Sequence, residues 1–485
     1  MSDGVALPER MLDRCNPILV REVQQAVNGR AFLLTVSASI CCVTIIAMVI
    51  AASGSASGEG LSAFIWTLTF FVPVALFIVP FQAFLSTRHE VSGGTAEHLL
   101  LTRLRPGAIV RGKLLAAMVQ YLVYLSIFAP LIALTFLLRG VDVPSIAFLL
   151  GLCTLASLCA TAFSVLLGAS SASARARTLP YILLAVILGG FSLSVMGAMQ
   201  TLLMSVGFVI RRGEFWKVFG ALSFPVIAML LLFSQGAAAQ LTHAYENRST
   251  PFRLLSFAAV VVAYIWIWLV APPDDDAGPA MALIAAAIFF FFWLFSVTEE
   301  EQLSPRMKTR VPRRSWLAAL SVPFLPGGGR GMLHSWMVAV AAIGGMYVYS
   351  DLAGVTIDQN GEMAAWTAWM YVMIYASMAR LLRGRLASGE RGTRLARVAT
   401  PAIIFLLAVL PTVFEALADQ RVRGWHTGQI FNPFWTIEQV GRSRTFGPVL
   451  SVLALTNMLL LVFTAPAMGR GIVEVRAASR ARRAR

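Results

Sequence analysis

Residues 88–113, RHEVSGGTAEHLLLTRLRPGAIVRGK, form a compact, charged and glycine-punctuated island between two long apolar runs. The runs on either side, residues 63–86 and 114–138, each have about the 20 residues that a helix needs to cross the hydrocarbon core of a membrane. A chain that crosses a membrane many times has little use for such a polar connection unless another molecule binds it. How the island is interpreted therefore decides how the whole chain is interpreted.

The composition extends this pattern to the whole chain. Its 485 residues are 58% hydrophobic and 13% charged, whereas a soluble protein carries about 25% charged residues. We therefore predict an all-α, polytopic integral membrane protein with about twelve transmembrane helices, in a range of eleven to thirteen. The predicted spans are residues 31–52, 63–86, 114–138, 146–168, 180–199, 218–241, 254–271, 280–297, 335–350, 364–382, 399–417 and 446–467.

The basic residues predict the orientation of these spans. With both termini in the cytosol, the predicted inside segments hold 31 of the 39 Lys and Arg residues and the outside segments hold 8. Such a bias is the positive-inside rule, and it also accounts for the net charge of +15 without nucleic-acid binding. Since thirty mostly polar residues precede the first apolar run, we expect a retained signal-anchor rather than a cleaved signal peptide.

The chain is expected to have six parts. These are a cytosolic amphipathic connecting helix (1–30), a six-span half with the loop 88–113 (31–253), two further spans (254–297), a cytosolic linker (298–334), four further spans (335–467) and a basic cytosolic tail (468–485). In the first part, Asn16 and Pro17 suit the start of a helix. Its apolar stripe is expected to lie on the inner membrane surface, with polar residues mostly opposite. The stripe is Leu19, Val23, Ala26 and Val27, and the polar residues are Arg21, Glu22, Gln24, Gln25 and Asn28.

The island itself predicts a short helix across the cytosolic face. Gly93 and Gly94 permit a sharp turn, and Thr95 can cap the helix that follows. Pro106 ends that helix and suits the start of the next one. The intervening apolar ridge consists of Leu100, Leu101 and Leu104.

No sequence pattern points to chemistry carried out by the chain itself. Its five cysteines and five histidines lack metal-binding spacing, and the run Gly327–Gly331 lacks the order of a phosphate-binding loop. Charge is scarce inside the spans, with Glu415 the one acidic residue clearly embedded in an apolar run, and this argues against an ion-coupled carrier, which needs buried carboxylates. We expect the Phe289–Phe292 run with Trp293 to face lipid.

Two motifs resemble those of a known family. Glu90, Gly94-Thr95-x-Glu97-x-Leu99-Leu100 and Ile109-Val110-x-Gly112-Lys113-Leu114 resemble the loop between the second and third spans of ABC-2 type transporter permeases. The segment Asn16-Pro-Ile-Leu-Val-Arg-Glu22 looks like the connecting helix of that family. The resemblance covers about residues 15–250, and Val91, Ser92 and Arg103 depart from the common pattern.

The resemblance implies a permease subunit of an ATP-driven exporter in a bacterial cytoplasmic membrane, with its first six spans in the ABC-2 fold. A separate cytosolic ABC ATPase would bind ATP and Mg²⁺, and the chain would be no enzyme itself. It would form a homodimer, or a heterodimer with a similar permease, among membrane lipids. The ATPase-coupling residues would be Glu90, Gly94, Thr95, Glu97, Leu99, Leu100, Leu104 and Lys113, beside Asn16, Pro17, Arg21 and Glu22 of the connecting helix.

Two other functions stay open at this point. A membrane-embedded lipid-modifying enzyme would need clustered catalytic groups, and His426 with Arg421, Arg423 and Glu438 forms no recognisable pattern. A non-transporting scaffold regulated by an ATPase would use the same loop without moving a substrate. The transported substrate and the role of residues 254–485 do not follow from the sequence.

Overall fold

The computed structural model describes residues 17–53, 59–93, 105–138, 141–170, 179–209, 212–242, 246–386, 389–417, 427–442 and 447–484. Within these ranges every regular element is a helix and no strand occurs. The predicted all-α class is therefore confirmed. The helices divide into two compact units: unit 1 comprises Met1–Trp216 and Val226–Thr242, and unit 2 comprises Lys217–Pro225 and His243–Arg485.

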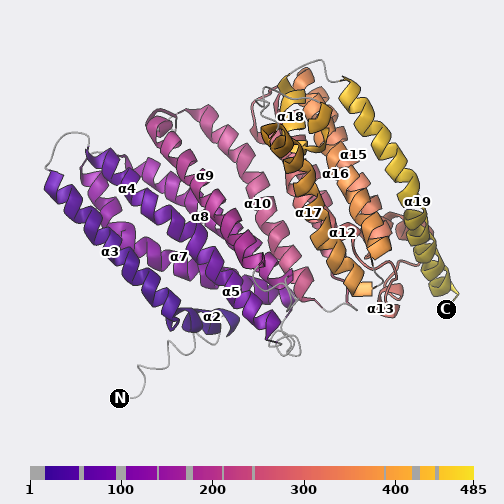
Figure 1. The fold of residues 1–485 in the computed structure, drawn as a ribbon, viewed down its shortest axis with the longest axis horizontal. Helices are drawn as coiled ribbons and strands as arrows, with labels where there is room; N and C mark the ends of the chain where they lie inside the picture. The colour runs from indigo at the N-terminus through magenta and orange to yellow at the C-terminus, as the bar shows by residue number, and fades with distance from the viewer. Residues whose placement is uncertain are drawn as a thin grey trace. The chain divides into compact units, whose positions relative to one another are not determined.

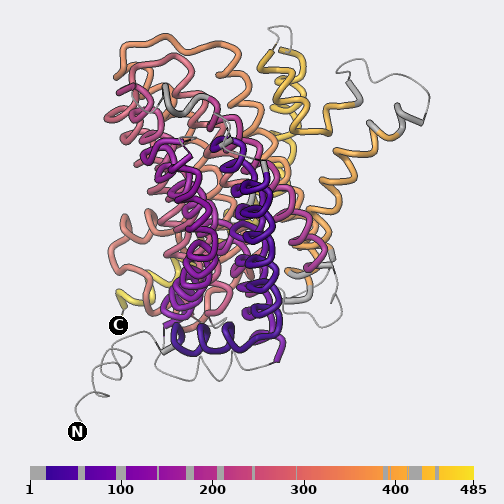
Figure 2. Tube along the Cα trace, turned by 90° about the vertical axis from the view of Figure 1, so that its left-hand side faces the viewer, coloured from indigo at the N-terminus to yellow at the C-terminus, as the bar shows by residue number. Residues whose placement is uncertain are grey.

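Unit 1 begins with the short helix α2, which lies crosswise to the longer helix α3 at one end of the unit (Figure 2). The helices of unit 1 are α2 (Pro17–Val27), α3 (Arg30–Ser53), α4 (Glu59–Pro73), η1 (Val74–Ile78), α5 (Val79–Ser92), α7 (Pro106–Leu137), α8 (Val143–Ser170), α9 (Leu179–Val209) and most of α10 (Gly213–Leu241). Figure 1 shows the long ones running side by side as a bundle.

Unit 2 has a second bundle of long helices with shorter ones at its ends (Figure 1). Its helices are α11 (Thr250–Val270), α12 (Ala277–Val297), α13 (Pro305–Lys308), α14 (Ser315–Ser321), η2 (Val322–Phe324), α15 (Gly328–Ala353), α16 (Gln359–Leu386), α17 (Gly389–Leu417), η3 (Thr427–Phe431), α18 (Pro433–Arg442) and α19 (Gly447–Arg483). The predicted linker 298–334 is thus occupied by α13, α14, η2 and the first turns of α15. The predicted tail is the end of α19.

Nine helices in the described part of the chain are long and apolar enough to cross a membrane. They are α3, the continuous helix over Gly60–Ser92, α7, α8, α9, α10, α11, α15 and α19, and each coincides with a predicted span. The chain is therefore a multi-pass membrane protein. Helices α12, α16 and α17 lie at the other three predicted spans, and membrane crossing by these three stays a prediction.

The two units share an order of packing. We number the long helices of each unit in chain order. The most extensive packing in each unit is then between the second and the fourth: α5 on α8 in unit 1, and α12 on α16 in unit 2. The third helix contacts both the first and the second, as α7 contacts α3 and α4 and α15 contacts α11 and α12. Both units therefore share these three neighbour relations, although their sequences show no second copy of the island, and they differ elsewhere: α19 packs on α15 and α16 in unit 2, whereas α9 packs on α4 in unit 1.

The second helix of unit 1 is interrupted by the π-helical segment η1, directly after Pro73. Proline lacks a backbone N–H, and a π-turn shifts the backbone bonds by one residue, so a carbonyl loses its usual donor. Ser157 of α8 supplies a donor: its hydroxyl donates to the carbonyl oxygen of Ala75 at 2.7 Å. The distortion is thus stabilised by the neighbouring helix.

The prediction that the Phe289–Phe292 run with Trp293 faces lipid is wrong for Phe289, Phe292 and Trp293. Phe289, Phe292 and Trp293 are buried in the core of unit 2, where Phe289 packs on Trp369 with ring centroids 5.8 Å apart. The hydrophobic run has no polar face, so the sequence alone does not distinguish lipid contact from helix contact. Burial follows because α12 packs against both α15 and α16.

Candidate functional site

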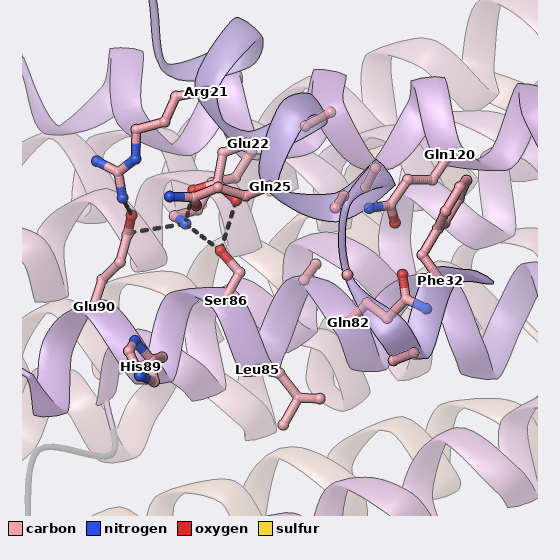
Figure 3. Close-up of a pocket in the computed structure, with 17 residues that line it drawn as sticks. Arg21, Glu22, Gln25, Phe32, Gln82, Leu85, Ser86, His89, Glu90 and Gln120 are labelled. Atoms are coloured by element: carbon pink, nitrogen blue, oxygen red, sulfur yellow. Dashed lines mark hydrogen bonds and ion pairs between the residues drawn. The ribbon is translucent and has the colours of Figure 1, made fainter. Parts of the chain in front are cut away.

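The candidate site of unit 1 lies where the connecting helix meets the two ends of the island. Helix α2 packs on α7, which begins at Pro106 and holds the last residues of the island. Helix α5, which also contacts α7, ends at Ser92 and holds the first residues of the island. Side chains from α2, α5 and α7 converge in this region (Figure 3). The three elements are remote in sequence, so only the fold brings their charges together.

Lys113 is the central residue of this cluster. Its side chain is 2% exposed, and its Nζ lies 2.6 Å from Oε1 of Glu22 and 2.9 Å from Oε2 of Glu90. The same ammonium group donates to the hydroxyl of Ser86 at 2.9 Å. Lys113 therefore connects one carboxylate from α2 to one from α5.

Ser86 and Arg21 complete the cluster. The Ser86 hydroxyl donates to Oε2 of Glu22 at 2.6 Å, and Arg21 forms an ion pair with Glu90 (Figure 3). Two carboxylates thus face two cations, and Lys113 has three oxygen partners. A buried ion pair requires such extra hydrogen bonds, because each charge loses its hydration on burial. We call Arg21, Glu22, Ser86, Glu90 and Lys113 the hub.

The hub sets the ionisation of Glu22. Burial raises the pKa of this carboxyl, but the charge of Lys113 and the hydrogen bonds from Lys113 and Ser86 together bring it below its ordinary value of 4.5. The carboxylate is therefore the form that stabilises the hub. Removing Lys113 would leave that carboxylate without its main partner.

A cavity of about 510 Å³ lies beside the hub. Three amide side chains line it, Gln25 of α2, Gln82 of α5 and Gln120 of α7, together with Phe32 of α3 (Figure 3). Amide groups both donate and accept hydrogen bonds, so this wall does not select one sign of charge. The cavity lies among α2, α3, α5 and α7, and the charged side chains of the hub line it too.

The end of α5 is fixed on its other side by Arg88. Its guanidinium lies over the ring of Tyr181 in α9, 4.6 Å from the ring centroid, and 5.8 Å from that of Phe84. A cation over an aromatic face is attracted by the ring's negative surface. A displacement of the island's first residues is therefore transmitted to α9 as well as to α2 and α7.

The structure brings four of the predicted site residues together in the hub: Arg21, Glu22, Glu90 and Lys113. Pro17 lies in α2 and is the first residue that the structure describes, so its place at the start of the helix stays a prediction. The remaining predicted residues, Asn16, Gly94, Thr95, Glu97, Leu99, Leu100 and Leu104, lie outside the described residues. The predicted short helix of the island therefore stays a prediction.

Two features of the hub were missed from the sequence. Glu22 was placed on the polar side of the connecting helix but is buried, while Val27 of the predicted apolar stripe is exposed. Ser86 gave no sequence signal, because a serine near the end of an apolar run is common. Residues of opposite charge stand near the ends of α2, α5 and α7. This pattern could have predicted the ion pairs of the hub.

Unit 2 contains a second polar cluster that was also missed. Arg253 at the start of α11 is fully buried and pairs with Glu299 at 2.8 Å. Its guanidinium also donates to the carbonyl oxygens of Pro323, Leu325, Ser296 and Gly327. Arg253 therefore holds the segment between α12 and α15, mainly through backbone carbonyl oxygens of that segment.

Arg330, in the first turn of α15, likewise combines an ion pair with hydrogen bonds to backbone carbonyls. It is 1% exposed, pairs with Glu474 of α19 at 3.0 Å and donates to the carbonyl oxygens of Glu301 and Pro326. Arginine offers five donors in a rigid fork, which suits it to hold several carbonyls at once.

Comparison of the chain with family models, with curated proteins and with solved structures finds no match.

Proposed function

We propose that this chain is the transmembrane permease subunit of an ABC-2 type exporter, driven by a separate cytosolic ATPase. The observation that carries the proposal is the hub: Lys113, at the exit of the island, is bound to Glu90 at its entry and to Glu22 of α2. The two motifs that resemble the family are thus joined by buried ion pairs. ATP and Mg²⁺ would be bound by the ATPase.

In this proposal the island is the part that the ATPase holds. The described ends of the island belong to two long helices: α5 extends to Ser92 and α7 starts at Pro106. A force on residues 94–104 would therefore move two long helices, and α5 would carry α8 through their extensive packing. The scarcity of charge in the spans favours a hydrophobic or amphipathic substrate.

The test is a double substitution in the island. We expect Glu97→Ala with Leu100→Ala to abolish co-purification of the ATPase, or its stimulation by the permease, while the chain still inserts into the membrane. ATP-driven flux in inside-out vesicles should disappear with it. A matched control is Glu246→Gln, which removes an exposed carboxylate from unit 2.

Two outcomes would contradict the proposal. Unchanged co-purification and unchanged stimulation of the ATPase in the island variant would show that the island is not the coupling element. Loss of ATPase binding without any ATP-driven flux in the unmodified complex would favour the regulated scaffold instead.

A further inference from the structure

The short helices between α12 and α15 form a folded element on unit 2. Leu303, Met307, Val311, Ala318 and Val322 are buried against the last turns of α19, around Val475 and Ala478. The hydroxyl of Ser479 donates to the carbonyl oxygen of Pro312 at 2.9 Å. The surface of this element is therefore held in place by its own small core.

That surface is strongly basic. Two of its cations are paired, Arg306 with Glu246 and Lys308 with Glu474. The sequence has no acidic residue between Gln302 and Ser350, and none after Glu474. Six exposed arginines have no acidic partner within the described residues: Arg310, Arg313, Arg314, Arg476, Arg480 and Arg483. We call these six the basic surface.

Large apolar side chains lie next to the basic surface. Trp316 and Leu320, one turn apart on α14, are 60% and 66% exposed, and Leu317 between them is also exposed. Residues four apart share one face of a helix, so the two form a single apolar edge. An exposed tryptophan and leucine on a structured element need a partner that accepts apolar groups.

The position of α14 indicates which partner this is. Phe324, three residues after α14, packs on Phe257 of α11 with ring centroids 6.0 Å apart, and on His334 of α15. Helices α11, α15 and α19 can all cross a membrane. Helix α14 therefore lies near the first turns of α11 and α15 and against the last turns of α19, and we place this level at the boundary between hydrocarbon and water. Tryptophan and arginine beside apolar side chains are the residues that favour this boundary.

We propose that the basic surface, with Trp316 and Leu320, binds the headgroups of anionic phospholipids in the cytosolic leaflet. The arginines would bind lipid phosphates, and the apolar edge of α14 would enter the upper acyl region. Clusters of several cations beside a span bind an anionic leaflet in this way. The proposal concerns unit 2 alone and does not depend on coupling to an ATPase.

The first experiment measures lipid retention by the purified full-length chain in neutral detergent. Native mass spectrometry would count bound phosphatidylglycerol and phosphatidylcholine at equal concentration. We expect a preference for phosphatidylglycerol that weakens at high salt, because screening acts on exposed charges. Replacing Arg310, Arg313 and Arg314 by Gln should weaken phosphatidylglycerol binding at least about tenfold, since each such cation contributes about 1 kcal/mol.

The matched control removes the same charge elsewhere. Arg212, Lys217 and Arg442 are also exposed, and their replacement by Gln should leave the preference unchanged. Equal losses in the two triple variants, or no preference in the unmodified chain, would overturn the proposal. So would loss of an acidic protein partner from the first variant together with unchanged lipid retention.

A second experiment locates the apolar edge. In bilayers that contain brominated phosphatidylglycerol, the fluorescence of Trp316, obtained as the difference between the unmodified chain and Trp316→Phe, should be quenched. Quenching should fall when Arg310, Arg313 and Arg314 are replaced. An unquenched Trp316 would place α14 away from the lipid and contradict the proposal.

Discussion

The two units connect their second and third long helices in different ways. In unit 1 the connection is held at its ends by contacts between side chains, with Lys113 between Glu22 and Glu90 beside a cavity of about 510 Å³. In unit 2 the connection itself is held, because Arg253 and Arg330 bind its backbone carbonyls. A cavity of about 430 Å³ also lies beside Arg330 and Glu474, so the units differ in the partners and not in the cavity: charged side chains hold the connection of unit 1, and mainly backbone carbonyls hold that of unit 2. The difference suits a moving connection in unit 1 and a fixed one in unit 2.

The largest expected effect is in unit 2. Arg253→Met would leave Glu299 without its buried ion-pair partner and would remove a side-chain donor from four carbonyl oxygens, of which that of Gly327 keeps the backbone N–H of Gly331. Breaking a buried pair from one side costs about 3–5 kcal/mol. We expect a large drop in the thermal unfolding midpoint of the detergent-solubilised chain.

Arg306→Gln is the control for that experiment. Arg306 and Glu246 are both well exposed, so the substitution should change the free energy of unfolding by about 0.5 kcal/mol or less. If Arg253→Met were as mild as this control, the connection of unit 2 would not depend on the buried guanidinium.

In unit 1, Lys113→Met should release α2 rather than unfold the unit. Glu22 would lose its ion pair with Lys113, and Glu90 would lose one of its two cations and keep Arg21, at a cost of about 3 kcal/mol. Hydrogen exchange should become faster in Pro17–Val27 and stay unchanged in α14. Since α14 is held by unit 2, equal loss of protection in both segments would contradict the difference between the two connections.

Two further variants separate charge pairing from packing. Adding Glu22→Gln to Lys113→Met removes the unpaired carboxylate, so the double variant should recover part of the protection of α2. Arg111→Met, an exposed cation on the same helix, should leave α2 protected. No recovery in the double variant would mean that Lys113 acts by packing alone.

Close helix packing offers a comparison of smaller effects. A Cβ on Gly331 would lie 2.2 Å from the carbonyl oxygen of Ser296, whereas a Cβ on Gly168 would lie 3.0 Å from the side chain of Thr87. We expect Gly331→Ala to cost about 2–3 kcal/mol and Gly168→Ala about 1 kcal/mol, because overpacking costs more against backbone. Thermal unfolding midpoints would measure both.

The controls for these variants lie on the same two helices. Nothing lies within 4 Å of a Cβ on Gly344 of α15 or Gly151 of α8, so Ala should be tolerated at both positions. Equal losses at Gly331 and Gly344 would attribute the effect to helix composition rather than to the contact with Ser296.

The sequence predicted the features that depend on local pattern. Apolar runs longer than a membrane is thick leave few alternatives to helices, and α3, α7 and α8 lie at predicted spans. The features it missed depend on contacts remote in the chain. Glu22 is polar by composition, yet Lys113, 91 positions later, draws it inward. Arg253 likewise has its partners at Glu299 and Leu325, which no helical spacing relates to it.

The smallest effect is the pH dependence that Glu22 gives to α2 in unit 1; in unit 2 the pKa of Glu474, which pairs with Arg330, is lowered as well. Because the pKa of Glu22 lies below its ordinary value of 4.5, the carboxylate stabilises the packing of α2 fully above about pH 4.5. That contribution is lost as the pH falls through the lowered value, since the protonated carboxyl no longer attracts Lys113. Four of the five partners of Arg253 are backbone carbonyls, which do not titrate.

Hydrogen-exchange protection factors, corrected for intrinsic rates, would measure this effect between pH 7 and pH 3. The protection of α2 should fall as the pH falls through the lowered pKa of Glu22, and it should fall further than the protection of α14. Glu22→Gln should remove most of the pH dependence in α2, because Gln keeps its shape but cannot titrate. If α2 lost protection equally in that variant, the pH response would come from a group outside the hub, and the reversible contact of unit 1 would have to be sought elsewhere.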